Sequence, residues 1–388
     1  MTTRPEFEAT VSFIKSLYPD NSFIPLHTPH FRGNEKKYLN ECIESTFVSS
    51  VGKFVDTFEE KICQITQSKH AVAVVNGSAA LHMALKASGV KEGDLVITQA
   101  LTFVATANSI VYCNASPSFI DIESTGLGMC PKSLKRFIDK ECYPKGRELW
   151  HKGTERRIAA CLPVHIFGHP CNMEAILEIC DSAAIAVIED STESLGSKRK
   201  RRHTGTFGKA GVFSFNGNKI VSSGGGGVLV TDDENMAAYA KHLTTTAKIP
   251  HKWEYFHDEV GYNYRLPNIN AALACAQLEQ LNNILENKRE TARAYCDFFE
   301  QQKMRFLKEP EDSLSNYWLN AIILEDKKER DEFLEYTNEN GVMTRPCWTL
   351  LNKLPMFSQC PHSALPNSNE MESRIVNLPS SYRNTQVN

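Results

Sequence analysis

VFSFNGNKIVSSGGGGVLV (residues 212–230) joins two short apolar runs through a lysine, Lys219, and four consecutive glycines at 224–227. Short apolar runs bounded by turn residues are typical of buried strands. Four glycines cost conformational entropy, so they indicate a turn with positive φ or a close approach of the backbone to another group. The lysine beside them is suited either to binding phosphate or to forming a Schiff base.

Upstream of this stretch, short apolar runs alternate with helical patterns. We expect strands at residues 70–75, 95–98, 118–121, 157–164 and 184–189, and helices at 34–46, 79–88, 103–112, 131–138 and 173–180. Such alternation predicts βαβ units and a mostly parallel sheet that is covered on both faces. After residue 230 the alternation ends, and we expect helices at 237–243, 268 to about 301 and 328–340, with a strand at 320–324. The pattern predicts a large α/β domain, residues 1–250, and a smaller C-terminal α+β domain, residues 251–388.

The composition is that of an ordinary soluble globular protein. Of the 388 residues, 41% are hydrophobic and 23% are charged, and the net charge of -3 gives no electrostatic case for binding nucleic acid or an anionic membrane. The N-terminus lacks the apolar segment of a signal peptide, and the longest uncharged run contains too many polar residues to span a bilayer. The 12 cysteines show no paired spacing, which favours reduced thiols and a cytoplasmic location.

Several polar groups follow the ends of expected strands, where open parallel sheets bind their ligands. Gly77, Ser78 and Ala79 open a helix directly after the first strand, so their amides and the Ser78 hydroxyl can bind phosphate. The alternative is an ordinary helix cap. Phe103 follows the second strand, where its ring would either stack on a flat cofactor or belong to the core.

Asp190 ends the strand at 184–189, and Glu193 lies one helical turn beyond it. A buried carboxylate needs a partner, which is either a helix terminus or a cationic nitrogen of a ligand. Ser214 ends the next strand and offers a hydroxyl to a phosphate. Together with Lys219, these groups match what pyridoxal phosphate requires: a phosphate site, a stacking ring, an aspartate for the pyridinium nitrogen and a Schiff-base lysine.

Two other nucleotide-binding patterns fit the lysine stretch poorly. A P-loop places its glycines before the Lys-Ser/Thr pair, whereas Lys219 precedes the glycines here. The dinucleotide fingerprint opens a helix, but glycines 224–227 lead into an apolar run.

Five segments in this order resemble the DegT-type sugar-nucleotide aminotransferases. They are NGSAAL (76–81), TFVATANSI (102–110), EDSTESLGS (189–197), FSFNGNKIVSSGGGG (213–227) and GYNYRLPNINAAL (261–273). The resemblance runs from about residue 25 to TRPCW (344–348), and it is closest to the LegC-like branch of that family. It implies the aspartate aminotransferase-like fold, pyridoxal phosphate enzyme fold type I.

The resemblance also implies roles for single residues. Lys219 matches the lysine that forms the internal aldimine, and Asp190 matches the partner of the pyridinium nitrogen. Glu193 occupies the position that contacts the ring hydroxyl, and Phe103 matches the stacking aromatic residue. The phosphate-binding set corresponds to Gly77, Ser78, Ala79 and Ser214.

Asn263 matches an asparagine that reaches the phosphate of the neighbouring subunit's cofactor, which implies a homodimer with shared active sites. Arg265 and Arg345 lie in segments that are near the substrate in relatives, and the sequence assigns them no role.

The implied activity is transfer of an amino group from L-glutamate to C4 of a nucleotide-linked 4-keto-6-deoxy-N-acetylhexosamine, for bacillosamine- or legionaminic-type surface glycans. UDP and GDP remain open, as does amination at C3. Two alternatives are a dehydratase of the same fold, in whose relatives a histidine replaces the lysine, and a non-catalytic sensor. Lys219 argues against the first, and the complete set of cofactor residues argues against the second.

Two further clusters receive plain interpretations. The basic run at 198–203 predicts a solvated hairpin tip, because no wider basic field surrounds it. Cys161, His165, His169 and Cys171 carry metal-type ligands, but their spacing departs from the paired zinc patterns, so we expect no metal site.

Overall fold

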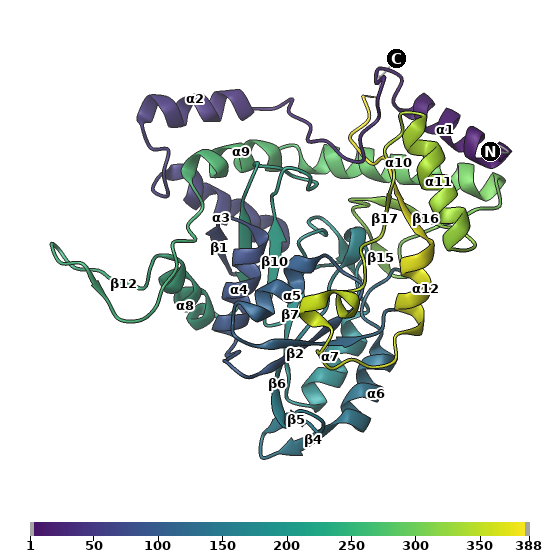
Figure 1. Cartoon of the computed structure of the whole chain (residues 1–388). Helices are drawn as coiled ribbons and strands as arrows, with labels where there is room; N and C mark the ends of the chain where they lie inside the picture. The colour runs from purple at the N-terminus through teal and green to yellow at the C-terminus, as the bar shows by residue number, and fades with distance from the viewer. Residues whose placement is uncertain (1–3, 385–388) are drawn as a thin grey trace.

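A nine-stranded mixed sheet forms the centre of the computed structural model, which describes residues 4–384 (Figure 1). Its main path runs in the order β1 (His70–Val74), β11 (Gly227–Thr231), β10 (Ala210–Ser214), β7 (Ala186–Asp190), β6 (Arg156–Leu162), β2 (Leu95–Gln99) and β3 (Ser116–Ile120). All pairs from β10 to β3 are parallel, and β11 runs antiparallel to both of its neighbours. The predicted mostly parallel α/β sheet is therefore confirmed.

Helices alternate with the strands as the periodicity predicts. They are α3 (Lys53–Thr66), α4 (Gly77–Ala87), α5 (Val104–Val111), α6 (Pro131–Glu141), α7 (Met173–Ser182) and α8 (Glu234–Thr244), with the short 3-10 turn η1 (Ile166–Gly168). The sequence reading had missed α3, although Phe54, Phe58 and Ile62 repeat every four residues and are buried on one face. It had also missed the hairpin of β4 (Cys142–Lys145) and β5 (Glu148–His151), which extends the sheet beside β6.

The four glycines form the return between β10 and β11. Ser214 pairs with Gly227, so the two strands begin their antiparallel ladder directly at the loop. A Cβ on Gly227 would lie 2.3 Å from the Asn76 carbonyl oxygen, and Gly224 has φ +76°. The close approach of the backbone predicted for the glycines is therefore seen at Gly227, which lies against the backbone turn that opens α4.

The C-terminal part forms a second, four-stranded antiparallel sheet. Its order is β14 (Arg305–Phe306), β16 (Asn320–Ile323), β18 (Ile375–Leu378) and β17 (Arg345–Pro346). Its helices and 3-10 turns are α9 (Asn268–Leu278), α10 (Leu281–Gln301), α11 (Lys327–Glu339), η2 (Leu351–Lys353), η3 (Pro355–Phe357) and α12 (Pro366–Arg374). The long helix expected from residue 268 to about 301 is two helices, because the chain leaves the helical path at Glu279 and Gln280. The sequence reading did not anticipate α12 or β18.

The N-terminal helix α1 (Pro5–Leu17) packs on these C-terminal elements (Figure 1). The rings of Phe7 and Phe333 meet edge to face at 5.1 Å, and Phe7 shares a buried cluster with Tyr295 on α10. The first residues of the predicted large domain therefore contribute to the core of the C-terminal elements. The division at residue 250 stays a prediction.

Three peripheral features complete the fold. The basic run forms the predicted hairpin, with β8 (Lys198–Arg199) and β9 (Arg202–His203) joined by an exposed turn and β15 (Ser313–Leu314) paired to β8. Helix α2 (Glu35–Ser45) and an arm that carries β12 (Lys248–Ile249) and β13 (Phe256–His257) extend from the same side of the molecule (Figure 1). Within residues 4–384, the helices lack the combination of length and apolar character that crossing a bilayer requires.

Candidate active site

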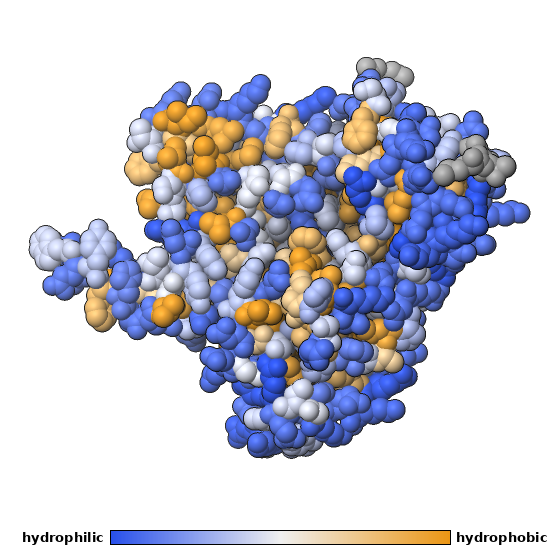
Figure 2. Space-filling model, viewed as in Figure 1, coloured by the Kyte–Doolittle hydropathy of each residue, from blue (hydrophilic) through white to orange (hydrophobic). Residues whose placement is uncertain are grey.

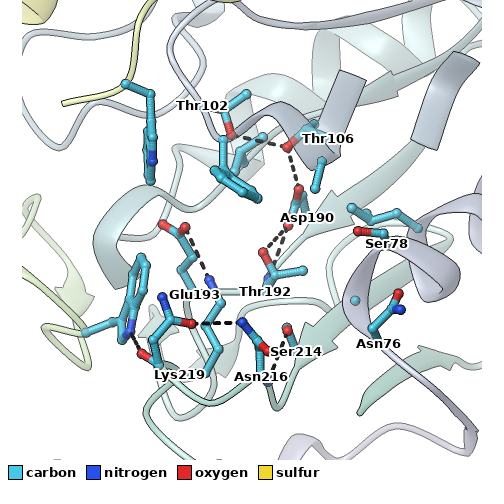
Figure 3. A pocket seen from close by; sticks show the side chains of 18 residues that line it. Asn76, Ser78, Thr102, Thr106, Asp190, Thr192, Glu193, Ser214, Asn216 and Lys219 are labelled. Atoms are coloured by element: carbon cyan, nitrogen blue, oxygen red, sulfur yellow. Dashed lines mark hydrogen bonds and ion pairs between the residues drawn. The ribbon is translucent and has the colours of Figure 1, made fainter. Parts of the chain in front are cut away.

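A pocket of about 360 Å³ lies where strands β1, β2, β7 and β10 end (Figure 3). It is lined by Asn76, Gly77, Ser78, Leu81, Thr102, Phe103, Ala105, Thr106, Val164, Asp190, Thr192, Glu193, Ser214, Asn216, Asn218, Lys219, Trp318 and Trp348. The parallel strands bring their carboxyl ends to one edge of the sheet, so residues from four separate segments meet there. Of the nine predicted cofactor residues, seven line this pocket, and Ala79 and Asn263 do not.

Asp190, the last residue of β7, is 2% exposed and fixed by three donors. Its Oδ2 accepts from Thr106 Oγ1 at 2.8 Å, and its Oδ1 accepts from Thr192 Oγ1 at 2.7 Å and from the Thr192 amide at 3.2 Å (Figure 3). Among residues 4–384, Asp190 has no ion-pair partner. A buried carboxylate that faces a pocket with only neutral donors is suited to a cationic ligand group.

Lys219 enters the pocket from the loop between β10 and β11. Its side chain is 12% exposed, and Nζ lies 3.4 Å from Glu193 Oε1 (Figure 3). On another side, Nζ lies 3.9 Å from the centroid of the Trp318 ring, within the range of a cation–π contact. The amine is therefore held inside the pocket by a carboxylate and an aromatic face.

Glu193 follows Asp190 by three residues, and both carboxylates are directed into the pocket (Figure 3). Its Oε2 accepts the Phe167 amide at 2.9 Å. Burial raises the pKa of Glu193, while Lys219 opposes the shift and Asp190 adds to it. This side chain therefore holds a proton more readily than an exposed glutamate.

The N-terminus of α4 lies at the part of the pocket that is predicted to bind phosphate. Asn76 is the cap of this helix, because its Oδ1 accepts the Ala79 amide at 2.8 Å. The Ala79 amide is thus occupied within the chain, whereas Gly77 and Ser78 face the pocket. A Cβ on Gly77 would lie 2.9 Å from Ser214 Cβ, so glycine is what allows β10 and α4 to approach this closely. The result is a concave site with two hydroxyls beside a helix N-terminus.

Phe103 precedes α5 and is 50% exposed, which excludes the core position that we had considered for it. Its ring centroid lies 6.2 Å from that of Trp348, at an interplanar angle of 57°. Phe103 thus presents an open aromatic face beside the pocket, as a stacking residue would.

Besides Ala79, three residues from the resemblance do not line this pocket of their own chain: Asn263, Arg265 and Arg345. Asn263 is exposed and accepts from Arg265 Nη2 at 3.3 Å. Arg345 donates from Nη1 to Asn338 Oδ1 at 2.9 Å. For Asn263, this position agrees with a role toward a second subunit, which stays a prediction.

The sequence reading missed several lining residues. Thr106 and Thr192, which orient Asp190, carry a weak signal, since Thr192 lies two residues after Asp190 and Thr106 lies three residues after Phe103. Trp318 and Trp348 carry none, because they come from the C-terminal part and reach the pocket only through the tertiary fold.

Three of the four side chains considered as metal ligands contact protein groups, whereas both ring nitrogens of the buried His169 have no hydrogen-bond partner among the described residues. His165 Nε2 lies 3.0 Å from Glu189 Oε2, and His165 Nδ1 accepts the Cys171 amide at 3.0 Å. The Cys171 thiol donates to the Val164 carbonyl at 3.1 Å, and the Cys161 thiol lies 3.5 Å from Met129 Sδ. These contacts fix the conformation of residues 161–171, at the end of β6 and directly after it.

Comparisons with known proteins agree with this geometry. A family model described as the DegT/DnrJ/EryC1/StrS aminotransferase family matches residues 29–386. A GDP-perosamine synthase of Escherichia coli O157:H7 is 36% identical over 367 residues, which is 94% of this chain and 96% of that protein. A GDP-perosamine synthase of Vibrio cholerae is 36% identical over 360 residues, 92% of this chain and 94% of that protein.

Solved structures share the fold. Helicobacter pylori PseC, an aminotransferase involved in the biosynthesis of pseudoaminic acid, superposes with a TM-score of 0.84 at 22% identity, over 94% of this chain and 95% of that one. An aminotransferase TlmJ from Streptoalloteichus hindustanus gives a TM-score of 0.83 at 23% identity, over 92% and 93%.

Pyridoxal phosphate is the cofactor of this family, and the pocket fits it. Asp190 is a buried carboxylate without a cationic partner among the described residues, and the cofactor's ring nitrogen is a cation when protonated. The close packing of Gly77 on Ser214 leaves a small polar concavity at the start of α4. With this fit and the match over residues 29–386, the chain belongs to the DegT/DnrJ/EryC1/StrS aminotransferase family and is a pyridoxal-phosphate-dependent sugar aminotransferase.

Proposed function

We propose that this enzyme transfers an amino group from L-glutamate to C4 of a nucleotide-linked 4-keto-6-deoxy sugar. The observation that carries the proposal is the meeting of Lys219 and Asp190 in one pocket at the strand ends. The two GDP-perosamine synthases, which align over more than nine tenths of the chain, support a nucleotide sugar as acceptor and C4 as the aminated carbon.

In the proposed mechanism, five groups hold the cofactor. Asp190 would pair with its ring nitrogen, Ser78 and Ser214 with its phosphate, Phe103 with a ring face, and Lys219 would bind it covalently. When bound, pyridoxal phosphate supplies an electron sink that stabilises negative charge on the substrate carbon. The donors from Thr106 and Thr192 hold the Asp190 carboxylate in a fixed orientation for this purpose.

The freed amine of Lys219 then moves the proton. Its Nζ removes a proton from the donor's α-carbon as a general base and returns one as a general acid. Glu193 Oε1 lies 3.4 Å from Nζ and restricts the positions that the amine can adopt. Trp318, which is 4% exposed, covers another side of the amine and shields it from water.

Two observations favour two different sugars as the acceptor. The resemblance to the LegC-like branch favours a UDP- or GDP-linked N-acetylhexosamine, for bacillosamine- or legionaminic-type glycans. The GDP-perosamine synthases favour a GDP-linked hexose. A screen of 4-keto- and 3-keto-6-deoxy sugar nucleotides with glutamate, with product analysis by mass and NMR, distinguishes the two sugars and reports amination at C4 or C3. Turnover confined to 3-keto sugars would overturn the C4 proposal.

Lys219→Ala tests the central assignment. Because Nζ is both the covalent anchor and the proton carrier, we expect loss of the near-visible absorbance of the bound cofactor and a fall in kcat of at least about 10³-fold. Lys209→Ala, at an exposed lysine at the start of the same strand, serves as the matched control and should retain both. An unchanged spectrum with retained turnover in the Lys219 variant would refute the assignment.

We also propose a homodimer with shared sites. Exposed apolar side chains on and after α2 form a patch that Figure 2 shows at the upper left: Ile43, Phe47, Val48 and Val51. The neighbouring arm exposes Trp253 and Tyr255. Apolar patches of this kind mark interaction surfaces. Asn263, which is also exposed, lies in the segment that follows this arm in the sequence.

Mixing two inactive variants tests the shared site. If Asn263 serves the partner's cofactor, a mixed dimer of Lys219→Ala and Asn263→Ala chains contains one intact site, so mixing should restore activity that neither variant has alone. Mixtures that stay inactive although the dimers exchange chains would contradict it.

A cytoplasmic location is part of the same proposal. The 12 cysteines are free in the structure, in keeping with a reducing compartment. Cell fractionation with an antibody against the chain checks this location.

A further inference from the structure

We propose that Trp318 is a positioning residue that holds the released amine of Lys219 and thereby favours the state in which the lysine is free of the cofactor. The inference rests on the role proposed above for Lys219. Trp318 does not follow a strand of the central sheet, so the argument from strand ends does not predict it. It lies two residues before the C-terminal strand β16.

Trp318 contacts the lysine segment at two points. Its ring face lies 3.9 Å from Lys219 Nζ, and its indole Nε1 donates to the Asn218 carbonyl at 2.6 Å. One side chain therefore binds both the amine and the backbone immediately before it. The hydrogen bond fixes the plane of the ring, so the π face is aimed at the amine rather than placed there by loose packing.

The backbone of Trp318 is fixed as well. Its amide donates to Asn316 Oδ1 at 2.8 Å, and its carbonyl accepts from the buried Lys288 Nζ at 2.8 Å. Asn316 Nδ2 in turn donates to the carbonyls of Glu193 and Leu195, each at 2.9 Å. Asn316 thus joins the segments that carry the two partners of Lys219, the Trp318 ring and the Glu193 carboxylate. The amine's binding place is built before any ligand arrives.

The contact with Trp318 affects the equilibrium between the free lysine and the lysine that is joined to the cofactor. In the first half-reaction, the bond between Lys219 Nζ and the cofactor breaks, the nitrogen of glutamate stays on the cofactor, one water supplies the oxo oxygen, and 2-oxoglutarate leaves. A free lysine concentrates its positive charge on Nζ, whereas a lysine joined to the cofactor shares its charge with the ring system. A π face at 3.9 Å therefore stabilises the free lysine more than the joined one.

The test is the half-reaction constant of the holoenzyme, measured by titrating the cofactor absorbance with glutamate and 2-oxoglutarate. Trp318→Leu removes the π face and should shift this constant about 5-fold to 30-fold toward the joined lysine, the ratio expected for a desolvated cation–π contact. Trp318→Phe keeps a weaker face and a closer fit, so its shift should be smaller and in the same direction.

Trp348→Leu is the matched control. Trp348 lines the same pocket, but its aromatic neighbours are Phe103 and Phe167, at 6.2 and 5.3 Å. We expect its half-reaction constant to stay within about twofold of wild type, whatever happens to turnover. Equal shifts in the Trp318 and Trp348 variants, or no shift in Trp318→Leu, would overturn the inference. In either case loss of the absorbance in Lys219→Ala would still uphold the proposed role of Lys219.

A second measurement does not depend on the cofactor. Cofactor-free protein is pulsed with formaldehyde and cyanoborohydride, and methylation at Lys219 is followed by peptide mass spectrometry. Removing the ring should raise the labelling rate of Lys219 about threefold or more, since the contact both holds and covers the amine. Lys328, whose side chain is 80% exposed, reports the reference rate in each sample. An unchanged Lys219 rate in both Trp318 variants would count against the inference.

Discussion

The two walls of the pocket are built on different principles. The sheet wall consists of residues that directly follow strands, such as Ser78, Asp190 and Ser214, and it supplies charge and hydrogen bonds. The C-terminal wall consists of Trp318 and Trp348, which lie far along the chain and supply flat apolar surface. In the proposed roles, the sheet wall selects the cofactor, whereas the C-terminal wall positions the amine of Lys219.

The largest effect should come from the sheet wall. Asp190→Asn keeps the shape of the side chain and removes its charge, so the protonated form of the cofactor's ring nitrogen loses its stabilising partner. An opposite charge in direct contact shifts a pKa by about 1–3 units, so we expect kcat to fall about 10²-fold to 10³-fold. Steady-state kinetics with saturating cofactor measure this fall.

Thr106→Val is the companion variant. It removes one donor to Asp190 Oδ2 but leaves the charge and the two contacts from Thr192. We expect kcat of this variant to fall about tenfold, which corresponds to the loss of one hydrogen bond to a charged group. If both variants kept more than half of the wild-type kcat, the sheet wall would not determine the chemistry as argued.

In the C-terminal wall, Asn316→Ala should chiefly lower stability. Asn316 is 1% exposed, and its loss leaves the carbonyls of Glu193 and Leu195 and the Trp318 amide without their partner. Unsatisfied buried groups cost about 1–3 kcal/mol each, so the free energy of unfolding should fall by about 3 kcal/mol in urea titration. Asn283→Ala, which removes an exposed contact with Tyr382, should change it by less than about 0.5 kcal/mol. Similar values for the two variants would show that Asn316 does not join the walls.

The smallest effect concerns Glu193, where the walls meet. Burial raises the pKa of this carboxyl above 4.5, so the folded protein binds its proton more tightly than the unfolded chain does. The stability that this proton provides is complete below pH 4.5 and is lost as the pH rises through the raised value. Thermal unfolding of the cofactor-free protein should therefore show wild type losing stability relative to Glu193→Gln as the pH increases. A difference that is constant with pH, or that runs in the opposite direction, would contradict the shift.

The sheet wall could be predicted from the sequence because its geometry is local. Each strand of the α/β part is an apolar run of about five residues, and the groups that follow it must lie at the carboxyl edge of a parallel sheet. The strand ends predict Gly77, Ser78, Phe103, Asp190 and Ser214, and Lys219 follows from the glycine-rich stretch after β10. The same reasoning misjudged Ala79, because an asparagine two residues before Ser78 takes its amide as a helix cap.

The C-terminal wall could not be predicted because its position depends on distant packing. Helix α1 is stabilised against residues more than 300 positions away, as in the contact of Phe7 with Phe333. The break at Glu279 and Gln280 lies inside a sequence whose apolar spacing continues on both sides. Trp318 reaches Lys219 only after Asn316 and Lys288 have fixed its backbone, and such partners leave no periodic trace in the sequence.

The packing of Gly77 on Ser214 has a consequence for how this family of sequences can vary. Ser214 Cβ lies 2.9 Å from where a Gly77 Cβ would be, so the space holds one β-carbon and not two. A side chain can enter position 77 only if position 214 becomes glycine and if Thr192 Cγ2, which would lie 3.1 Å from the new Cβ, also moves. A single substitution at position 77 is therefore disfavoured. A redesign of this part of the pocket has to change positions 77 and 214 together.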